Sequence, residues 1–343
     1  MDRGAAVKAV VRLAASCIAA ALLVAGCGSD DKAADETAPA QTGWVDDEVT
    51  FTADGLTIHG TYRHRDGSGP AALLISESGQ TDRNGDNAVA GPVGNMRQLA
   101  ELLSERDVAS LRYDKVGTGR TGLGPYATRP ADVGTAVYTA GAAAALRFLA
   151  DQPDTASDRI SVYALGEGTV HAMSLAAAND PAVHSLALLQ PLAARYLDII
   201  TGRVRAEADP TVLANWLAAV EEIRTKGTVP AQLPEGLGAI VNPGNIKAVI
   251  EADRVDPLAL AAKVPAGTPV LLTCSNSDGQ AKCDALRPLM DALRHTELTV
   301  VELDGVNHVL RDDPSDNVAN YAQQAPLSPQ VVKALDEFVG EQP

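Results

Sequence analysis

A sharp turn between a strand-like run and a helical run is the first place in the chain where chemistry is expected. Residues 159–168 read RISVYALGEG and precede a helical pattern. Such a junction can hold a nucleophile on a strained turn, the nucleophile elbow, if the residues two before and two after it are small. Ala164 and Gly168 meet this requirement around Gly166, whereas Glu167 would have bulkier neighbours at these positions. Gly166 is therefore the residue expected at the elbow.

With this turn the chain resembles the α/β-hydrolase superfamily, particularly its secreted esterase and serine-peptidase-like members. Those proteins carry G-x-S-x-G where residues 164–168 read ALGEG. The similarity runs from about Val49 to the C-terminus. It includes residues 74–85 (LISESGQTDRNG), where relatives often have Gly-Ser-Gly followed by Asp-Arg, and residues 112–119 (RYDKVGTG). The resemblance implies an α/β fold with a mostly parallel sheet, an N-terminal antiparallel hairpin and a helical lid insertion.

The resemblance also implies the other two members of a catalytic triad. Asp278 follows the apolar run 268–274, where the family places its carboxylate. His308 follows the run 298–303, where the family places its general base. The order of turn, acid and histidine along the chain agrees with this fold. Two triad positions are thus filled, and the nucleophile position is vacant at Gly166.

The missing hydroxyl is the atom that attacks, whereas the imidazole and carboxylate activate and orient it. Its removal typically costs on the order of 10⁶ in turnover. The resemblance implies an oxyanion loop that involves Glu77, Ser78 and Glu167, and Glu77 stands where a glycine is usual. If Glu77 points inward, its negative charge opposes an oxyanion. The site is therefore expected to be catalytically impaired.

A relocated nucleophile is the alternative for this site. The candidates near the elbow and the oxyanion loop are the side chains of Ser76, Ser78, Thr169, Ser174 and Glu167. None of them occupies the elbow itself. Direct attack by a water molecule that His308 and Asp278 activate is a further alternative.

The elements that must position these residues alternate along the chain. A hairpin is predicted from residues 48–53 and 56–63, which Asp54-Gly55 joins. Near-continuous apolar runs that alternate with helical patterns indicate a parallel sheet covered on both faces. The predicted strands of that sheet are 71–76, 109–113, 159–163, 184–190, 268–274 and 298–303, and the predicted helices are 95–107, 132–151, 168–179, 283–294 and 328–340.

One long segment, about residues 195–262, is helix-prone and contains no strong strand. It lies between the predicted strands 184–190 and 268–274. An insertion at this point lies over the carboxyl edge of the sheet, where sites form in open α/β folds. The segment is interpreted as a lid, with a helical excursion that has no gating role as the alternative.

The N-terminus has the pattern of a bacterial lipoprotein signal. Residues 1–26 combine a basic start with a short apolar run, and Cys27 follows small residues at its end. We expect cleavage before Cys27, acylation of this cysteine, and attachment to the outer face of the cell membrane, with ordinary secretion as the alternative. Residues 27–43 are small, polar and acidic, which is typical of a flexible tether. The hydrolase-like domain is expected over residues 44–343.

The formal net charge of −16 argues against nucleic-acid binding, because phosphate recognition needs a basic face. The run 117–122 spells G-x-G-x-x-G, but Pro125 follows closely and prevents the direct helix start that a dinucleotide site needs. The remaining histidines show no spacing typical of metal ligands. No cofactor and no metal is expected.

Of the four cysteines, Cys17 leaves with the signal and Cys27 is the lipid site. Cys274 and Cys283 remain, and two such thiols outside the cytoplasm are expected to form a disulfide. A metal site is the alternative, although no histidine or further cysteine lies near them in the sequence.

Two functions remain open. The first is a non-hydrolytic, membrane-anchored protein that binds a small molecule, lipid or peptide in the pocket of the fold; Gly166 and Glu77 favour it. The second is an active esterase, lipase or peptidase with a relocated nucleophile, for which Asp278 and His308 are the support. Labelling with a fluorophosphonate probe discriminates between the two.

Overall fold

An eight-stranded sheet forms the centre of the computed structural model, which describes residues 43–231, 233–234 and 236–341. The predicted signal peptide, and the tether up to residue 42, lie outside the described residues. The strand order is β1-β2-β4-β3-β5-β6-β7-β8. The strands are β1 (Val45–Ala53), β2 (Leu56–His64), β3 (Gly69–Ile75), β4 (Ala109–Tyr113), β5 (Thr155–Leu165), β6 (Ser185–Leu189), β7 (Pro269–Ser275) and β8 (Glu297–Leu303).

The first two strands form the antiparallel edge that the sequence predicts. Asp54 and Gly55 turn the chain at positive φ, and Ala53 pairs with Leu56 on either side of them. β2 then pairs antiparallel with β4, and from β4 onward all neighbouring strands are parallel. The inner parallel strands β3 and β6 are buried on both faces, which explains why they read as continuous apolar runs, whereas the edge strand β8 is largely exposed.

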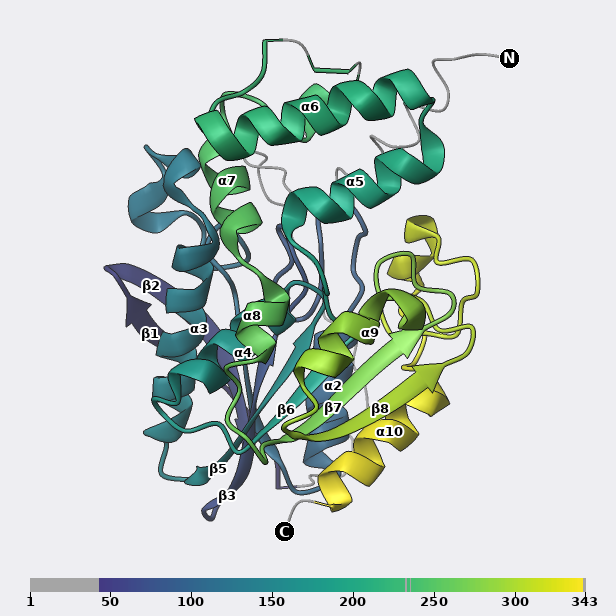
Figure 1. Ribbon diagram of the computed structural model, residues 1–343. Coiled ribbons are helices and arrows are strands. Elements are labelled where there is room, and N and C mark those ends of the chain that lie inside the picture. Colours follow the sequence, from purple (N-terminus) through teal and green to yellow (C-terminus); the bar gives the residue numbers. More distant parts are fainter. Residues whose placement is uncertain (1–42, 232, 235, 342–343) are drawn as a thin grey trace.

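Helices cover both faces of the sheet, so the domain has three layers (Figure 1). On one face α3 (Thr135–Ala150), α4 (Gly168–Ala178), α8 (Pro257–Ala261) and α9 (Cys283–Ala292) contribute to a core built around Leu73, Val162 and Leu272. On the other face α2 (Asn95–Ser104) and α10 (Pro329–Gly340) pack over Leu74 and Leu271. Leu, Val and Ala dominate both cores, as the low aromatic content requires.

The segment between β6 and β7 is helical. It contains α5 (Tyr196–Glu207), α6 (Pro210–Lys226), α7 (Ile246–Arg254) and α8. Helices α5 and α6 lie beyond the carboxyl ends of the parallel strands, and α7 descends from them toward α8 (Figure 1). The upper part has a core of its own around the fully buried Trp216, whose indole Nε1 donates a hydrogen bond to Thr201 Oγ1 at 3.0 Å. The position over the sheet edge therefore agrees with the lid interpretation.

One buried carboxylate fastens this helical insertion. Asp253, in α7, accepts hydrogen bonds from the Leu197 backbone N–H at 2.9 Å and from the guanidinium of Arg224 at 2.8 and 3.0 Å. Burial would raise the pKa of Asp253, but these bonds lower it below its usual value. The carboxylate thus joins α5, α6 and α7 into one unit.

The predicted hairpin, the parallel strands and the helices all appear in the structure, with boundaries that differ by a few residues. The largest difference is at β5, which starts at Thr155 rather than residue 159. Differences of three residues occur at the start of β1, the end of α2 and the start of α3. Among the described residues, no helix combines the length and apolarity that crossing a membrane requires.

Candidate functional site

The turn after β5 has the geometry of an elbow. Gly166 lies between the end of β5 at Leu165 and the start of α4 at Gly168, with φ of 55°. This left-handed backbone strains L-residues, whereas glycine adopts it readily. The backbone N–H of Gly166 donates to Leu189 O in β6, which fixes the turn over the neighbouring strand.

The structure explains why the residues two before and two after Gly166 must be small. A Cβ at Gly168 would lie 2.8 Å from Ile75 O and 2.9 Å from Ser76 O, because the start of α4 passes directly over the end of β3. Ala164, two residues before the turn, is fully buried. The close approach of strand and helix therefore requires the small residues from which the elbow was recognised.

Asp278 and His308 come from two neighbouring loops at the same edge of the sheet. Asp278 follows β7 and His308 follows β8, and His308 Nδ1 lies 2.7 Å from Asp278 Oδ2. The Asp278 side chain is completely buried, and its second oxygen accepts a hydrogen bond from Gln280 N at 2.6 Å. The structure thus brings together the acid and histidine that the resemblance to the superfamily implied.

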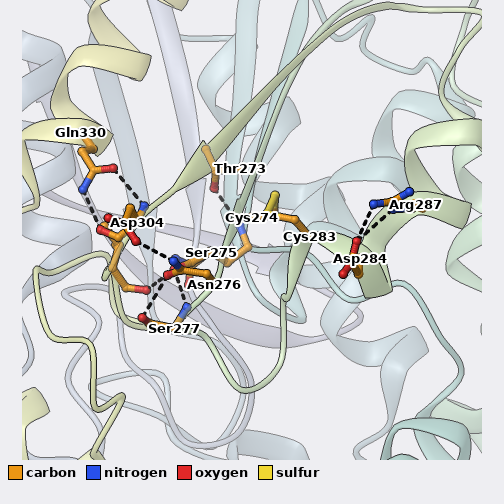
Figure 2. The surroundings of a disulfide bond; sticks show 12 residues. Thr273, Cys274, Ser275, Asn276, Ser277, Cys283, Asp284, Arg287, Asp304 and Gln330 are labelled. Carbon is orange, nitrogen blue, oxygen red and sulfur yellow. Dashed lines mark hydrogen bonds and ion pairs between the residues drawn. A yellow bond between two sulfur atoms is a disulfide. The ribbon is translucent and has the colours of Figure 1, made fainter.

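A disulfide closes the loop that carries Asp278 (Figure 2). It links Cys274, at the end of β7, to Cys283, at the start of α9. Asn276 joins this loop to the one before His308: its Nδ2 donates to Asp304 Oδ1 and its Oδ1 accepts from Gly305 N (Figure 2). Glu302 lies near the two sulfurs, but the disulfide uses the thiols that a metal site would need.

The fourth member of the site is Glu77, from the loop after β3. Its Oε2 lies 2.8 Å from His308 Nε2, the ring atom that faces the hydroxyl in a serine triad. Its Oε1 accepts a hydrogen bond from Ser78 Oγ at 2.6 Å. A Cβ built on Gly166 would lie only 2.3 Å from Glu77 Oε2 and 3.0 Å from His308 Nε2. The Glu77 carboxylate therefore fills the space next to the imidazole that a serine side chain would need.

The charges of Glu77, His308 and Asp278 stabilise one another. Burial alone would raise the pKa of Glu77, but the adjacent His308 charge, with hydrogen bonds from His308 and Ser78, lowers it to about 2. Burial alone would lower the pKa of His308, whereas the carboxylates of Asp278 and Glu77 raise it well above its usual value. At neutral pH the arrangement is a carboxylate–imidazolium–carboxylate row, and an imidazolium cannot accept a proton as a general base.

The hydroxyls considered as substitute nucleophiles are engaged elsewhere. Ser78 donates to Glu77, and the other three donate to backbone carbonyls: Ser76 Oγ to Thr81 O, Thr169 Oγ1 to Gly166 O, and Ser174 Oγ to Val170 O. His308 Nε2 is bonded to Glu77 instead. The fifth candidate, Glu167, lines the cavities beside the elbow.

Two further buried groups lie beside Glu77 and were not proposed as site residues from the sequence. Lys115, at the start of the loop after β4, donates a hydrogen bond from Nζ to the backbone carbonyl of Glu77. His171, in α4, pairs through Nδ1 with Thr139 Oγ1 at 2.9 Å, and burial lowers its pKa to about 3. Lys115 belongs to the RYDK segment of the superfamily resemblance, which was the available signal. Nothing in the sequence distinguishes His171 from a packed histidine.

Three cavities are lined by Glu77, Glu167 or His308. One of about 170 Å³ lies between α3, α7 and the loop after β4, and one of about 60 Å³ lies between α4, α5 and α8; both are lined by Glu167. A third, of about 90 Å³, is lined by Glu77 and His308. A further cavity, of about 480 Å³, opens at the opposite end of the parallel strands, around Gly69 and Ala109, and is not lined by His308.

Solved structures with the same fold are numerous. The structure of DcsB in complex with its substrate analogue aligns with a TM-score of 0.59 and 17% identity, over 87% of this chain and 99% of that one. Est1E from Butyrivibrio proteoclasticus, with bound ferulic acid, aligns with a TM-score of 0.58 and 16% identity over 86% and 98% of the two chains. The Pyrococcus furiosus esterase Pf2001 aligns with a TM-score of 0.54 and 16% identity over 91% and 96%.

No family model and no curated protein matches the sequence. The neighbours at this level of identity establish the architecture, and the antiparallel edge, the parallel sheet and the turn at Gly166 agree with it. The chain therefore has the α/β-hydrolase fold.

Proposed function

We propose that this protein is a non-hydrolytic α/β-hydrolase-fold protein that binds a ligand in the former active site. The observation that carries the proposal is the position of Glu77. Its carboxylate is hydrogen-bonded to His308 Nε2, and Gly166 offers no attacking atom. A negative charge beside the elbow also opposes the oxyanion of an acyl-transfer intermediate. Two properties of a serine-hydrolase site are thus absent together: a hydroxyl at the elbow and a histidine nitrogen that is free to act as base.

The pocket itself is retained. The cavities on either side of Glu167 are lined mainly by apolar side chains from the domain and the helical insertion, as binding sites for small molecules usually are. Under the same proposal, acylated Cys27 holds the domain at the outer face of the cell membrane by a tether of residues 27–43. The support for the anchor is the sequence pattern around Cys27.

The wild-type protein is expected to remain unlabelled by a fluorophosphonate probe and to hydrolyse short-chain nitrophenyl esters no faster than buffer. The reason is that the probe requires an activated hydroxyl, and every candidate hydroxyl near the elbow donates to another acceptor. An active serine esterase and the same protein after heat denaturation are the controls. Labelling of the native wild type at a single residue would overturn the proposal.

The position of Glu77 also supports a second candidate, a hydrolase in which this carboxylate is the nucleophile. Glu77 Oε2 would attack an ester carbonyl to form an anhydride, and the His308 imidazolium would protonate the departing alcohol. Water would then cleave the anhydride, returning a proton to His308 and the carboxylate to Glu77. Ester hydrolysis that is present in the wild type and abolished in Glu77→Gln would favour this candidate. Hydrolysis absent from both favours the non-hydrolytic one.

A further inference from the structure

A carboxylate without a hydrogen-bonded partner lines the cavities beside the elbow. Glu167 follows Gly166 directly and lines the cavities of about 170 and 60 Å³. Among the described residues, no hydrogen bond or ion pair holds its carboxylate, and the positive charge that acts on it is that of Lys115. The Lys115 ammonium instead donates to the backbone carbonyl of Glu77. Glu167 is therefore free to bind a group in the cavities.

The charges around Glu167 do not balance. With every group ionised, Glu77, Asp278 and Glu167 contribute three negative charges, whereas His308 and Lys115 contribute two positive ones. Burial raises the pKa of Glu167, and the Lys115 charge offsets this only in part. The Glu77 and Asp278 carboxylates lie on either side of the His308 ring and are bonded to it. Glu167 is thus the group whose charge is least compensated. Burying an uncompensated charge is costly, and a cation in the cavity would remove that cost.

The two cavities meet at shared residues. Thr135, Glu167 and Ala252 line both of them, so together they form two lobes on either side of one carboxylate. Most of the remaining lining is apolar: Val116, Leu123, Val133 and Ala248 in the larger lobe, and Val170, Leu192, Ile199 and Ile200 in the smaller. The ring of Tyr138 adds an aromatic face in the larger lobe. The Lys115 ammonium already lies 5.9 Å from the centroid of this ring, so the ring adds to the apolar lining of the lobe.

From this arrangement we propose that the ligand is an apolar amine whose ammonium group pairs with Glu167 and whose hydrocarbon arms lie in the two lobes. The proposal rests on the proposed function, because a ligand can occupy these lobes permanently only if the site does not turn it over. The ligand is thus cationic, is recognised by Glu167 and has one apolar arm in each lobe. An anionic ligand is disfavoured by Glu167 and Glu77 alike.

The test compares dibutylamine, which is cationic at neutral pH, with dibutyl ether, which has the same shape and no charge. Dissociation constants are measured by ligand-observed NMR on the mature chain from residue 27, with Cys27→Ser to prevent acylation. We expect the amine to bind the wild type at least tenfold more tightly than the ether. Glu167→Gln is expected to reduce this preference to within about twofold and to leave ether binding unchanged, which also shows that the variant is folded.

Glu251→Gln is the matched control. Glu251 lies in α7 next to Ala252, but its carboxylate accepts a hydrogen bond from Ala136 N at the start of α3, and it does not line either lobe. This variant is expected to keep the preference for the amine. The proposal is wrong if the amine binds the wild type no better than the ether, or if Glu167→Gln keeps the preference. If the ether binds as tightly as the amine, the pairing of an ammonium group with Glu167 is wrong. The proposed non-hydrolytic function is unaffected by that result, because fluorophosphonate labelling tests it separately.

Discussion

Gly166→Ser alone is expected to leave the protein without esterase activity, whereas Gly166→Ser combined with Glu77→Gly is expected to gain it. The double variant should hydrolyse p-nitrophenyl acetate on the order of 10³-fold faster than the wild type, a modest part of the roughly 10⁶ that a complete triad contributes. The measurement is the initial rate of nitrophenolate release by purified protein, with buffer subtracted.

The expected failure of the single variant has a steric and an electrostatic cause. The new Cβ would lie 2.3 Å from Glu77 Oε2, so the carboxylate or the elbow must move. If Glu77 stays, His308 remains an imidazolium and cannot accept the serine proton. Glu77→Gly removes both obstacles, because it opens the space and leaves Asp278 as the only carboxylate on the histidine.

Glu77→Gly alone is the control for this pair, since it opens the site without supplying a nucleophile. It should remain inactive. Activity in Gly166→Ser alone, equal to that of the double variant, would show that Glu77 does not obstruct the elbow. Inactivity of a folded double variant that also fails to react with a fluorophosphonate would show that Asp278 and His308 no longer form a working pair.

Glu77→Gln is expected to lower the free energy of unfolding by about 3 kcal/mol at pH 7. The pKa of Glu77 is lowered from 4.5 to about 2 in the folded protein, and each unit of such a shift corresponds to about 1.4 kcal/mol. Its side chain is only 19% exposed, so solvent screens the pairing with His308 only in part. Because the folded pKa is below the unfolded one, this stabilisation is complete above about pH 4.5 and is lost as the pH falls toward 2.

Urea unfolding of the wild type and Glu77→Gln between pH 7 and pH 2.5 checks this prediction. The difference between the two proteins should be constant down to about pH 5 and shrink below it. Glu337→Gln, which removes an exposed pair with Lys333, is the control and should cost under about 0.5 kcal/mol. A difference between wild type and Glu77→Gln that is small at pH 7, or that grows on acidification, would contradict the assignment of an ionised Glu77.

The sequence predicts the frame of this site well because local rules govern it. Ala164 and Gly168 must be small for the strand and helix to meet, and this identifies Gly166 without a structure. The strands before Asp278 and His308 are apolar runs, and parallel strands bring their carboxyl ends to one edge. The strand and turn patterns are short-range, so the sequence predicts them directly, whereas the roles of Asp278 and His308 follow from the resemblance to the superfamily.

The contact between Glu77 and His308 could not be predicted in the same way. The two residues are 231 positions apart, and whether Glu77 turns toward the histidine or into solvent depends on its rotamer and on packing by Ser78 and Lys115. From the sequence we could predict only that Glu77 would oppose an oxyanion if its side chain pointed inward. The cavities beside Glu167 likewise depend on how the helical insertion packs, which no local pattern encodes.

The protonation state of His308 tests the central claim most directly. Imidazole ¹⁵N shifts of the wild type at pH 8, with the His308 signals assigned from their absence in His308→Gln, report whether both ring nitrogens carry protons. His171 provides a neutral reference in the same spectra, because burial lowers its pKa to about 3. We predict that His308 is an imidazolium at pH 8, held between Asp278 and Glu77. A neutral His308 ring at pH 8 would contradict the claim that Glu77 has replaced the nucleophile as the partner of this histidine.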